Sequence, residues 1–140
     1  MSIRIATTDN DILSCHTVIV HLRPRYCASE FLSCVRNQQK EGYELAMLVD
    51  QDHTVAVAGY RVGHNLAWGK YLYVDDLVTD ESRRSAGHGQ RLMDWLVARA
   101  REQGCDQLHL DSGVQRYGAH RFYLRYGMDI TSHHFALDLP

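Results

Sequence analysis

A short glycine-containing segment has the residue types of an anion-binding turn. It follows an apolar run at residues 71–79 and precedes a helical pattern that begins at Gln90. Glycines let backbone N–H groups approach a phosphate closely, and the positive end of the following helix dipole points to the same place. Arginines just before the glycines can pair with phosphate oxygens. The sequence therefore predicts an anion site formed by Arg83, Arg84, Ser85, Ala86, Gly87, His88, Gly89 and Gln90.

The spacing of these glycines differs from that of two common phosphate loops. Leu92 stands where a dinucleotide-binding loop has its third glycine, and no Gly-Lys-Ser/Thr follows as in a Walker loop.

Two adjacent carboxylates, Asp75 and Asp76, interrupt the apolar run before this turn. Neighbouring residues of a strand point to opposite faces, so we expect one acid to face a polar cleft and the other to meet solvent or a helix end. A carboxylate in a cleft can serve as a general base. We favour Asp75 as the base, because in a regular strand it lies on the same face as Leu77 and Thr79. The alternative is a structural acid that pairs with Arg61 or caps a neighbouring element.

A second motif lies about 30 residues further on, at residues 119–128. Together the two motifs resemble those of the GCN5-related N-acetyltransferases (GNAT), which carry Arg/Gln-x-x-Gly-x-Gly/Ala after a strand and Asn-x-x-Ala-x-x-Phe-Tyr-x-x-x-Gly-Phe near the C-terminus. Arg116 replaces the asparagine of the second motif and Met128 its last aromatic residue. The residues that match it are Ala119, Phe122, Tyr123 and Gly127. The same helix also resembles the aminoalkylphosphonate N-acetyltransferases of this family.

The resemblance implies that acetyl-CoA binds with its pyrophosphate on the glycine turn. It further implies that the preceding strand supplies backbone N–H groups to the thioester and the pantetheine arm, at Leu77, Val78 and Thr79. Ala119 and Phe122 would lie against the cofactor, while Arg116 would contact either a cofactor phosphate or an anionic acceptor. Tyr123 would protonate the departing thiolate; the alternative for Tyr123 is a core tyrosine.

Acceptor binding is expected in the least regular segments. Arg23, Arg25 and Tyr26 form a basic, aromatic loop between two predicted helices, where the family builds its acceptor pocket. Such a loop suits an acceptor with a carboxylate or phosphonate beside its amine, and a solvated loop is the alternative. His109, beside the predicted cleft, is a second candidate base with a suitable ordinary pKa. We expect no metal site, because neighbouring histidines in a strand, such as His133 and His134, face opposite ways.

Composition narrows the functional classes. The chain has 140 residues, 45% hydrophobic and 23% charged, with a net charge of −2, which suits one domain over residues 1–140. That charge implies no general attraction to nucleic acid or acidic membranes. Without an apolar run of membrane length or a signal-peptide pattern, we expect a cytoplasmic protein whose four scattered cysteines are reduced.

The elements that position these residues follow from periodicity. Residues 71–79 are the clearest strand, and residues 90–102 form a helix closed by Gly104. With the remaining segments, the order is β-α-α-β-β-β-α-β-α-β, where the tail at residues 128–139 carries one or two strands. We expect an α+β, GNAT-like fold with a mixed sheet of six to seven strands flanked by about four helices.

These observations predict an N-acetyltransferase that moves an acetyl group from acetyl-CoA to a primary amine by direct attack in a ternary complex. A small-molecule acceptor is favoured. A protein lysine or N-terminus as acceptor, and a non-catalytic acyl-CoA-binding module, are the alternatives. The tail also offers a strand that can pair across a homodimer.

Overall fold

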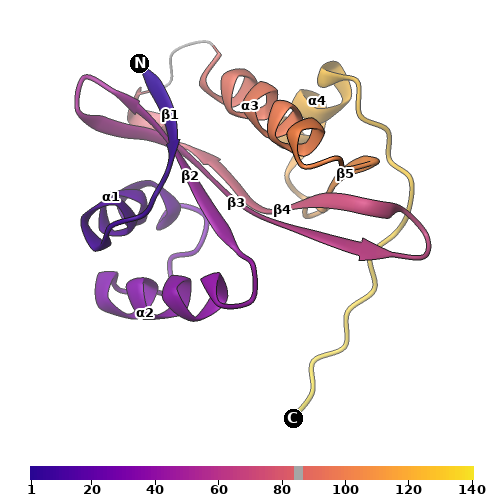
Figure 1. Cartoon of the computed structure of the whole chain (residues 1–140), viewed down its shortest axis with the longest axis horizontal. Coiled ribbons are helices and arrows are strands. Elements are labelled where there is room, and N and C mark those ends of the chain that lie inside the picture. Colours follow the sequence, from indigo (N-terminus) through magenta and orange to yellow (C-terminus); the bar gives the residue numbers. More distant parts are fainter. Residues whose placement is uncertain (84–86) are drawn as a thin grey trace. The chain divides into compact units, whose positions relative to one another are not determined.

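The computed structural model describes residues 1–83 and 87–140. Within them lie five strands, four α-helices and one short 3-10 helix (Figure 1). In chain order these are β1 (Ser2–Ile5), α1 (Asp9–Ile19), α2 (Ala28–Gln39), β2 (Glu44–Asp50), β3 (His53–Asn65), β4 (Gly69–Thr79), η1 (Glu81–Arg83), α3 (His88–Glu102), β5 (Gln107–Leu110) and α4 (Tyr117–Tyr126). No helix in this part of the chain is long and apolar enough to cross a bilayer.

The chain divides into two compact units, residues 1–109 and 110–140; a single domain over residues 1–140 stays a prediction. The first unit is built on a sheet in the order β1-β2-β3-β4-β5, in which β1 to β4 pair antiparallel with their neighbours. Helices α1 and α2 lie on one face of this sheet, and α3 lies on the other (Figure 1).

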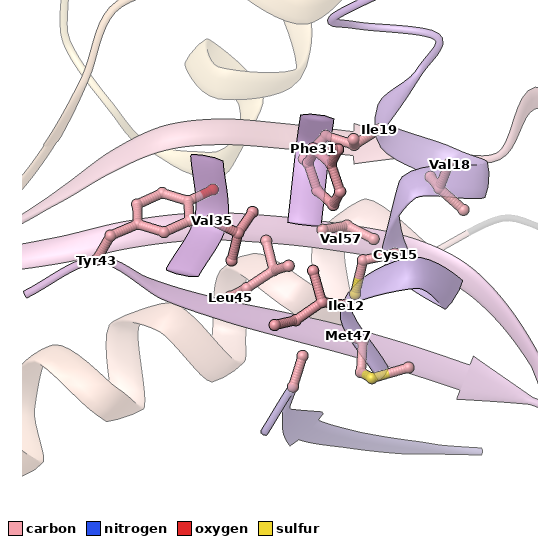
Figure 2. Packing of buried hydrophobic residues seen from close by; sticks show 11 residues of the cluster. Ile12, Cys15, Val18, Ile19, Phe31, Val35, Tyr43, Leu45, Met47 and Val57 are labelled. Atoms are coloured by element: carbon pink, nitrogen blue, oxygen red, sulfur yellow. The ribbon is translucent and has the colours of Figure 1, made fainter. Parts of the chain in front are cut away.

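The helical face of the first unit is held by a local cap and an apolar cluster. Thr8 accepts a hydrogen bond from the backbone N–H of Asp11, whose carboxylate accepts one from the N–H of Thr8, so a capping box starts α1. Figure 2 shows side chains from α1 and α2 packed on β2 and β3, with Tyr43 at the edge of the cluster. This core fixes the two helices against the sheet.

On the opposite face, α3 packs through its buried side chains Leu92, Met93, Leu96 and Ala100. Trp95 meets the ring of Tyr60 edge-on, with 5.9 Å between ring centroids. Arg99 donates to the hydroxyl of Tyr60 and lies 3.4 Å from the carboxylate of Glu44. Helix α3 is therefore tied to β2 and β3 by both apolar and charged contacts.

The second unit contains α4, which ends where the sequence predicts. Gly127 adopts a left-handed conformation with φ of 106°, and the N–H groups of Gly127 and Met128 donate to the carbonyls of Leu124 and Tyr123. This is the C-terminal cap expected of glycine.

The prediction of six to seven strands is wrong, because residues 128–140 contain neither a strand nor a helix. The tail has the alternating apolar side chains of a strand, Phe135, Leu137 and Leu139, but they are 91%, 84% and 83% exposed. A strand needs a partner for its backbone groups as well as a suitable pattern, and the sequence pattern alone does not supply one. The rest of the predicted order of elements agrees with the structure.

Candidate functional site

The two acids of β4 point to the same face of the sheet. Asp76 lies opposite Gly59 of β3 and Val74 lies opposite Tyr60, so Asp75 is an extra residue in a β-bulge. A bulge breaks the alternation of a strand. Both carboxylates consequently line one cavity on the α1–α2 side. The prediction that they face opposite ways is wrong, because it assumes an uninterrupted strand.

The two carboxylate oxygens of Asp75 differ in their hydrogen bonds. Arg61 donates to its Oδ2 from Nε at 3.0 Å and from Nη2 at 2.7 Å, and no hydrogen bond among the described residues reaches its Oδ1. Partial burial raises the pKa of Asp75, although the hydrogen bond and charge of Arg61 act in the opposite direction. The predicted structural contact with Arg61 is therefore present, yet a free oxygen remains to take a proton.

Asp76, in contrast, has both oxygens engaged. Its Oδ2 accepts from the hydroxyl of Tyr43 at 2.8 Å, and its Oδ1 accepts from Nε of Arg23 at 2.9 Å. Arg23 also donates to the backbone carbonyl of Asp75 at 3.2 Å. Burial and the nearby carboxylates hold the pKa of Tyr43 well above its usual range, so this hydroxyl is a permanent donor at neutral pH. Asp76 is thus the better anchored of the two acids.

The acids form the polar wall of a cavity of about 500 Å³, which we call the acid pocket. Its apolar wall comes from α1, α2 and the loop that joins them. The predicted acceptor loop lines it as well, so the structure brings together residues 50 positions apart in the sequence. The lining residues are Ile19, Leu22, Arg23, Pro24, Arg25, Tyr26, Phe31, Cys34, Val35, Gln38, Tyr43, Asp75 and Asp76. A cavity of this volume fits a small molecule.

The two arginines of the loop differ in their partners. Arg23 is neutralised by Asp76. Arg25 instead donates to the hydroxyl of Tyr26 and stacks on its ring, with 4.7 Å from guanidinium carbon to ring centroid. Among the described residues Arg25 has no carboxylate partner, so it is the loop cation that can bind an anionic group.

The start of α3 offers backbone groups rather than side chains. Gly87 precedes the helix with φ of 106° and has no atom within 4 Å of the place a Cβ would occupy. Among the described residues the first intrahelical bond runs from Arg91 N–H to the Gly87 carbonyl, so the backbone N–H groups of Gly89 and Gln90 lie before the first such bond of the helix. No acidic residue stands in this first turn. These residues fit a phosphate-bearing cofactor.

The side chains near this turn are less available to bind an anion than the sequence predicts, because several already have partners or are buried. Arg83 lies 3.8 Å from the carboxylate of Asp80, and the amide of Gln90 donates to Asp94 at 3.2 Å. His88 is buried. Arg84, Ser85 and Ala86, which belong to the predicted anion site, lie outside the described residues.

The C-terminal end of β4 extends beyond its neighbour β5. Leu77 and Val78 pair with Ala58 and Val57 of β3. On the other side β5 has four residues and begins beside Lys70, whose carbonyl accepts from Asp106 N–H at 2.7 Å. Thr79, the last residue of β4, lies far beyond that point. Backbone groups of this strand end can therefore serve a ligand.

The remaining predicted residues lie on α4 or on β5. In the second unit, Tyr123 is half-buried, and burial raises its pKa while the charge of Arg116 lowers it. Phe122 meets Tyr123 at 5.5 Å between ring centroids, and Ala119 lies one helical turn earlier. In the first unit, His109 stacks on Trp68 at 3.4 Å and contacts Gln107 at 2.6 Å; it does not line the acid pocket, and its acceptor role stays a prediction.

The sequence analysis missed the partners that hold the acids. Tyr43, Gly59 and Gln38 are separated from Asp75 and Asp76 by 16 to 38 positions, and Gln38 reaches the pair through Arg61 at 3.2 Å. A tyrosine just before a strand and a glycine inside one are too common to predict such a contact. The glycine opposite a pair of acids is the one available signal, since glycine inside a strand often marks a bulge.

Comparisons with known proteins agree on one family. The sequence model of the Acetyltransferase (GNAT) family matches residues 9–128. An uncharacterized N-acetyltransferase, YhdJ of Bacillus subtilis (strain 168), is 38% identical over 98 residues, which is 69% of either chain. Among solved structures, an aminoglycoside N-acetyltransferase in complex with CoA superposes with a TM-score of 0.87 at 12% identity, over 99% of this chain and 93% of that one. An acetyltransferase of Trypanosoma brucei gives 0.80 at 24% identity, over 99% of both chains.

Proposed function

The chain belongs to the GNAT family of acyl-CoA-dependent N-acetyltransferases, which use acetyl-CoA, and we propose that it acetylates a small primary amine bound in the acid pocket. The observation that carries this proposal is the free Oδ1 of Asp75, whose pKa is raised, in a cavity of about 500 Å³. A carboxylate with a raised pKa is suited to take a proton from an ammonium group. Asp75, rather than Asp76, is the proposed general base.

Acetyl-CoA is proposed to bind along the end of β4 and the start of α3. The N–H groups of His88, Gly89 and Gln90, with the turn at residues 83–87, bind the pyrophosphate. The strand end at Leu77, Val78 and Thr79 offers backbone groups to the pantetheine arm and the thioester. The supporting observations are the left-handed Gly87 before α3, the absence of an acidic residue in the first turn of α3, and the length of β4 beyond β5. Arg116, which precedes α4, and Ala119 and Phe122 within α4 are assigned to the cofactor by resemblance to the family motif.

The proposed reaction is a single displacement. Asp75 accepts a proton from the acceptor ammonium, directly or through water, and the neutral nitrogen attacks the thioester carbonyl carbon. A C–N bond forms and the C–S bond breaks. Tyr123, whose raised pKa keeps its proton in place, gives that proton to the departing sulfur. The acylated nitrogen then loses its remaining extra proton to water, and Asp75 and Tyr123 regain their starting forms by proton exchange with solvent. The products are the N-acetyl amine, CoA and one proton. Holding both substrates at once supplies much of the rate, because the thioester is already activated.

The acceptor is proposed to carry a carboxylate or phosphonate beside its amine, bound by Arg25. Arg23 is the weaker candidate because Asp76 already neutralises it, whereas Arg25 has no acidic partner among the described residues. We expect Arg25→Ala to raise the acceptor KM about 10-fold with kcat nearly unchanged, as for the loss of a charged contact equal in ground and transition states. Steady-state kinetics measure this. If Arg25→Ala and Arg23→Ala both leave KM unchanged, the anionic acceptor is wrong.

The function itself is tested by thiol release from acetyl-CoA in the presence of a panel of amines. The panel contains aminoalkylphosphonates, amino acids, polyamines, aminoglycosides and lysine peptides, with calorimetric binding of acetyl-CoA run in parallel. Binding with turnover on a small amine supports the proposal. Turnover on peptides alone favours a protein acceptor, and binding without turnover favours an acyl-CoA-binding module. An absence of binding overturns the proposed cofactor site.

We also propose that the protein is a homodimer in which the tail pairs with a second copy, and that it acts in the cytoplasm. The alternating exposed side chains of Phe135, Leu137 and Leu139 support the first of these. Light scattering after size-exclusion chromatography should give twice the 16.1 kDa of one chain. A mass of one chain at every concentration contradicts the dimer.

A further inference from the structure

Tyr43 makes a contact that the proposed reaction does not use. It is 3% exposed, and it places a polar hydroxyl at the edge of an apolar cluster (Figure 2). The hydroxyl donates to Oδ2 of Asp76 at 2.8 Å. A phenylalanine would fill the same space in the core, so packing alone does not explain the hydroxyl group at this position.

Gly59 is the residue that lets this hydroxyl reach the acid. It faces Asp76 across the β3–β4 pair, at the bulge. A Cβ at this position would lie 1.7 Å from the hydroxyl oxygen of Tyr43, 2.4 Å from Cζ and 2.7 Å from Cε1. The tyrosine ring therefore lies directly against the backbone of Gly59, where no other residue leaves room for it.

Arg61 also contacts the ring of Tyr43. The guanidinium of Arg61 lies 5.5 Å from the centroid of the Tyr43 ring and binds Oδ2 of Asp75. The ring of Tyr43 thus contacts the partner of one acid while its hydroxyl binds the other acid. The two carboxylates, adjacent in a bulge, are held apart by separate donors.

We propose that Tyr43 is a positioning residue for acetyl transfer, and that Gly59 provides the space that this role requires. The hydroxyl of Tyr43 and Nε of Arg23 together occupy both oxygens of Asp76 and prevent it from turning toward Arg61. Asp75 then keeps its bond to Arg61 through one oxygen and offers the other to the acceptor. This inference rests on the proposed function, in which Asp75 is the base.

The test compares Tyr43→Phe, Gly59→Ala and the double variant in acetyl transfer to the amine identified by the panel. We expect Tyr43→Phe to lower kcat about 10-fold, the effect of one lost hydrogen bond to a charged group, with the acceptor KM and acetyl-CoA binding nearly unchanged. Gly59→Ala should lower kcat similarly, because it displaces the hydroxyl without removing it. The double variant should be no slower than Tyr43→Phe, since both changes break the same contact.

Gly63 provides a matched control in the same strand. A Cβ at Gly63 would lie 2.7 Å from the hydroxyl of Tyr71 and 2.9 Å from its Cζ, so Gly63→Ala displaces a tyrosine ring in the same way. The hydroxyl of Tyr71 binds neither acid. We expect Gly63→Ala to leave kcat nearly unchanged, while any general damage to the sheet would appear in both alanine variants.

A second readout needs no substrate. The hydroxyl proton of a buried, hydrogen-bonded tyrosine exchanges slowly and can be observed by proton NMR. The signal that disappears in Tyr43→Phe should also be lost in Gly59→Ala and in Asp76→Ala, but should persist in Gly63→Ala. These spectra test the contact even if the wild-type protein acetylates none of the amines, a result that would overturn the proposed function separately.

Three results would overturn the inference. One is an unchanged kcat in Tyr43→Phe. Another is a double variant whose loss is the product of the two single losses, which would mean that the residues act independently. The third is a hydroxyl signal that persists in Gly59→Ala, which would show that Gly59 is not required for the contact.

Discussion

The acid pocket and the start of α3 carry their chemistry in different ways. The pocket uses side chains from α1, α2, the segment before β2, and the two strands β3 and β4. The start of α3 is proposed to use the backbone N–H groups of consecutive residues after a left-handed glycine. One region therefore depends on contacts between distant residues, and the other depends on local conformation. Substitutions should separate the two, with acceptor chemistry lost in one region and cofactor binding lost in the other.

The largest effect is expected from Asp75→Asn, which removes the proposed base from the pocket. We expect kcat to fall about 10²- to 10⁴-fold, in the range of general base catalysis. Acetyl-CoA binding, measured by calorimetry, should not change, because the start of α3 is untouched. Asp76→Asn is the comparison, since both oxygens of Asp76 already have donors. A larger loss in Asp76→Asn than in Asp75→Asn would reverse the assignment of the two acids.

The next effect is expected from Tyr123→Phe, the proposed acid. At neutral pH kcat should fall about 10- to 1000-fold, because the raised pKa of Tyr123 keeps its proton available and phenylalanine has none to give. The Kd for acetyl-CoA should remain nearly intact. Tyr117→Phe, on the same helix and 65% exposed, is the matched control. An unchanged kcat in Tyr123→Phe would remove this residue from the mechanism.

The contrast between the two regions also explains what the sequence can predict. The anion site proposed at residues 83–90 could be predicted because the expected signal consists of a few consecutive residues and the helix that follows them. The C-terminal cap at Gly127 could be predicted for the same reason. The family and the order of nine elements from β1 to α4 follow from such local patterns.

The acid pocket could be predicted only in outline. The sequence predicts that Asp75, Asp76 and the loop at residues 23–26 take part, because two acids interrupt an apolar strand and the loop combines two arginines with a tyrosine. The only sign of the bulge in the sequence is Gly59 in the partner strand, which does not show where the extra residue of β4 lies. Without the bulge, the acids would face opposite ways. The bond from Tyr43 to Asp76 depends on the pairing of β3 with β4. The strand predicted in the tail is absent for a related reason, because the alternating pattern of a strand does not specify its pairing partner.

A smaller effect is expected at the start of α3 from Gly87→Ala. No described atom beyond its chain neighbours lies within 4 Å of the place a Cβ would occupy at Gly87, but its φ of 106° strains any residue with a Cβ by about 1 to 2 kcal/mol. We expect the Kd for acetyl-CoA to rise about 5- to 30-fold through the displaced amides, while the acceptor KM stays unchanged. Gly104→Ala is the control, because Gly104 has φ of 72° in open space at the other end of α3. Equal effects of both variants on Kd would contradict a local anion site.

The smallest effect, and the finest test of the pocket, is expected from Arg61→Gln. Activity requires the carboxylate form of Asp75, so kcat falls as the pH drops through its pKa. The hydrogen bond and charge of Arg61 both lower that pKa against the effect of burial. Removing them raises the pKa further, and the acidic limb of the pH–rate profile should move to higher pH, with little loss of kcat well above it. Arg99→Gln, which breaks the contacts to Tyr60 and Glu44 on the other face of the sheet, should leave the limb in place. A limb that stays fixed in Arg61→Gln would mean that a group other than Asp75 titrates, and Asp75 would then no longer be the proposed base.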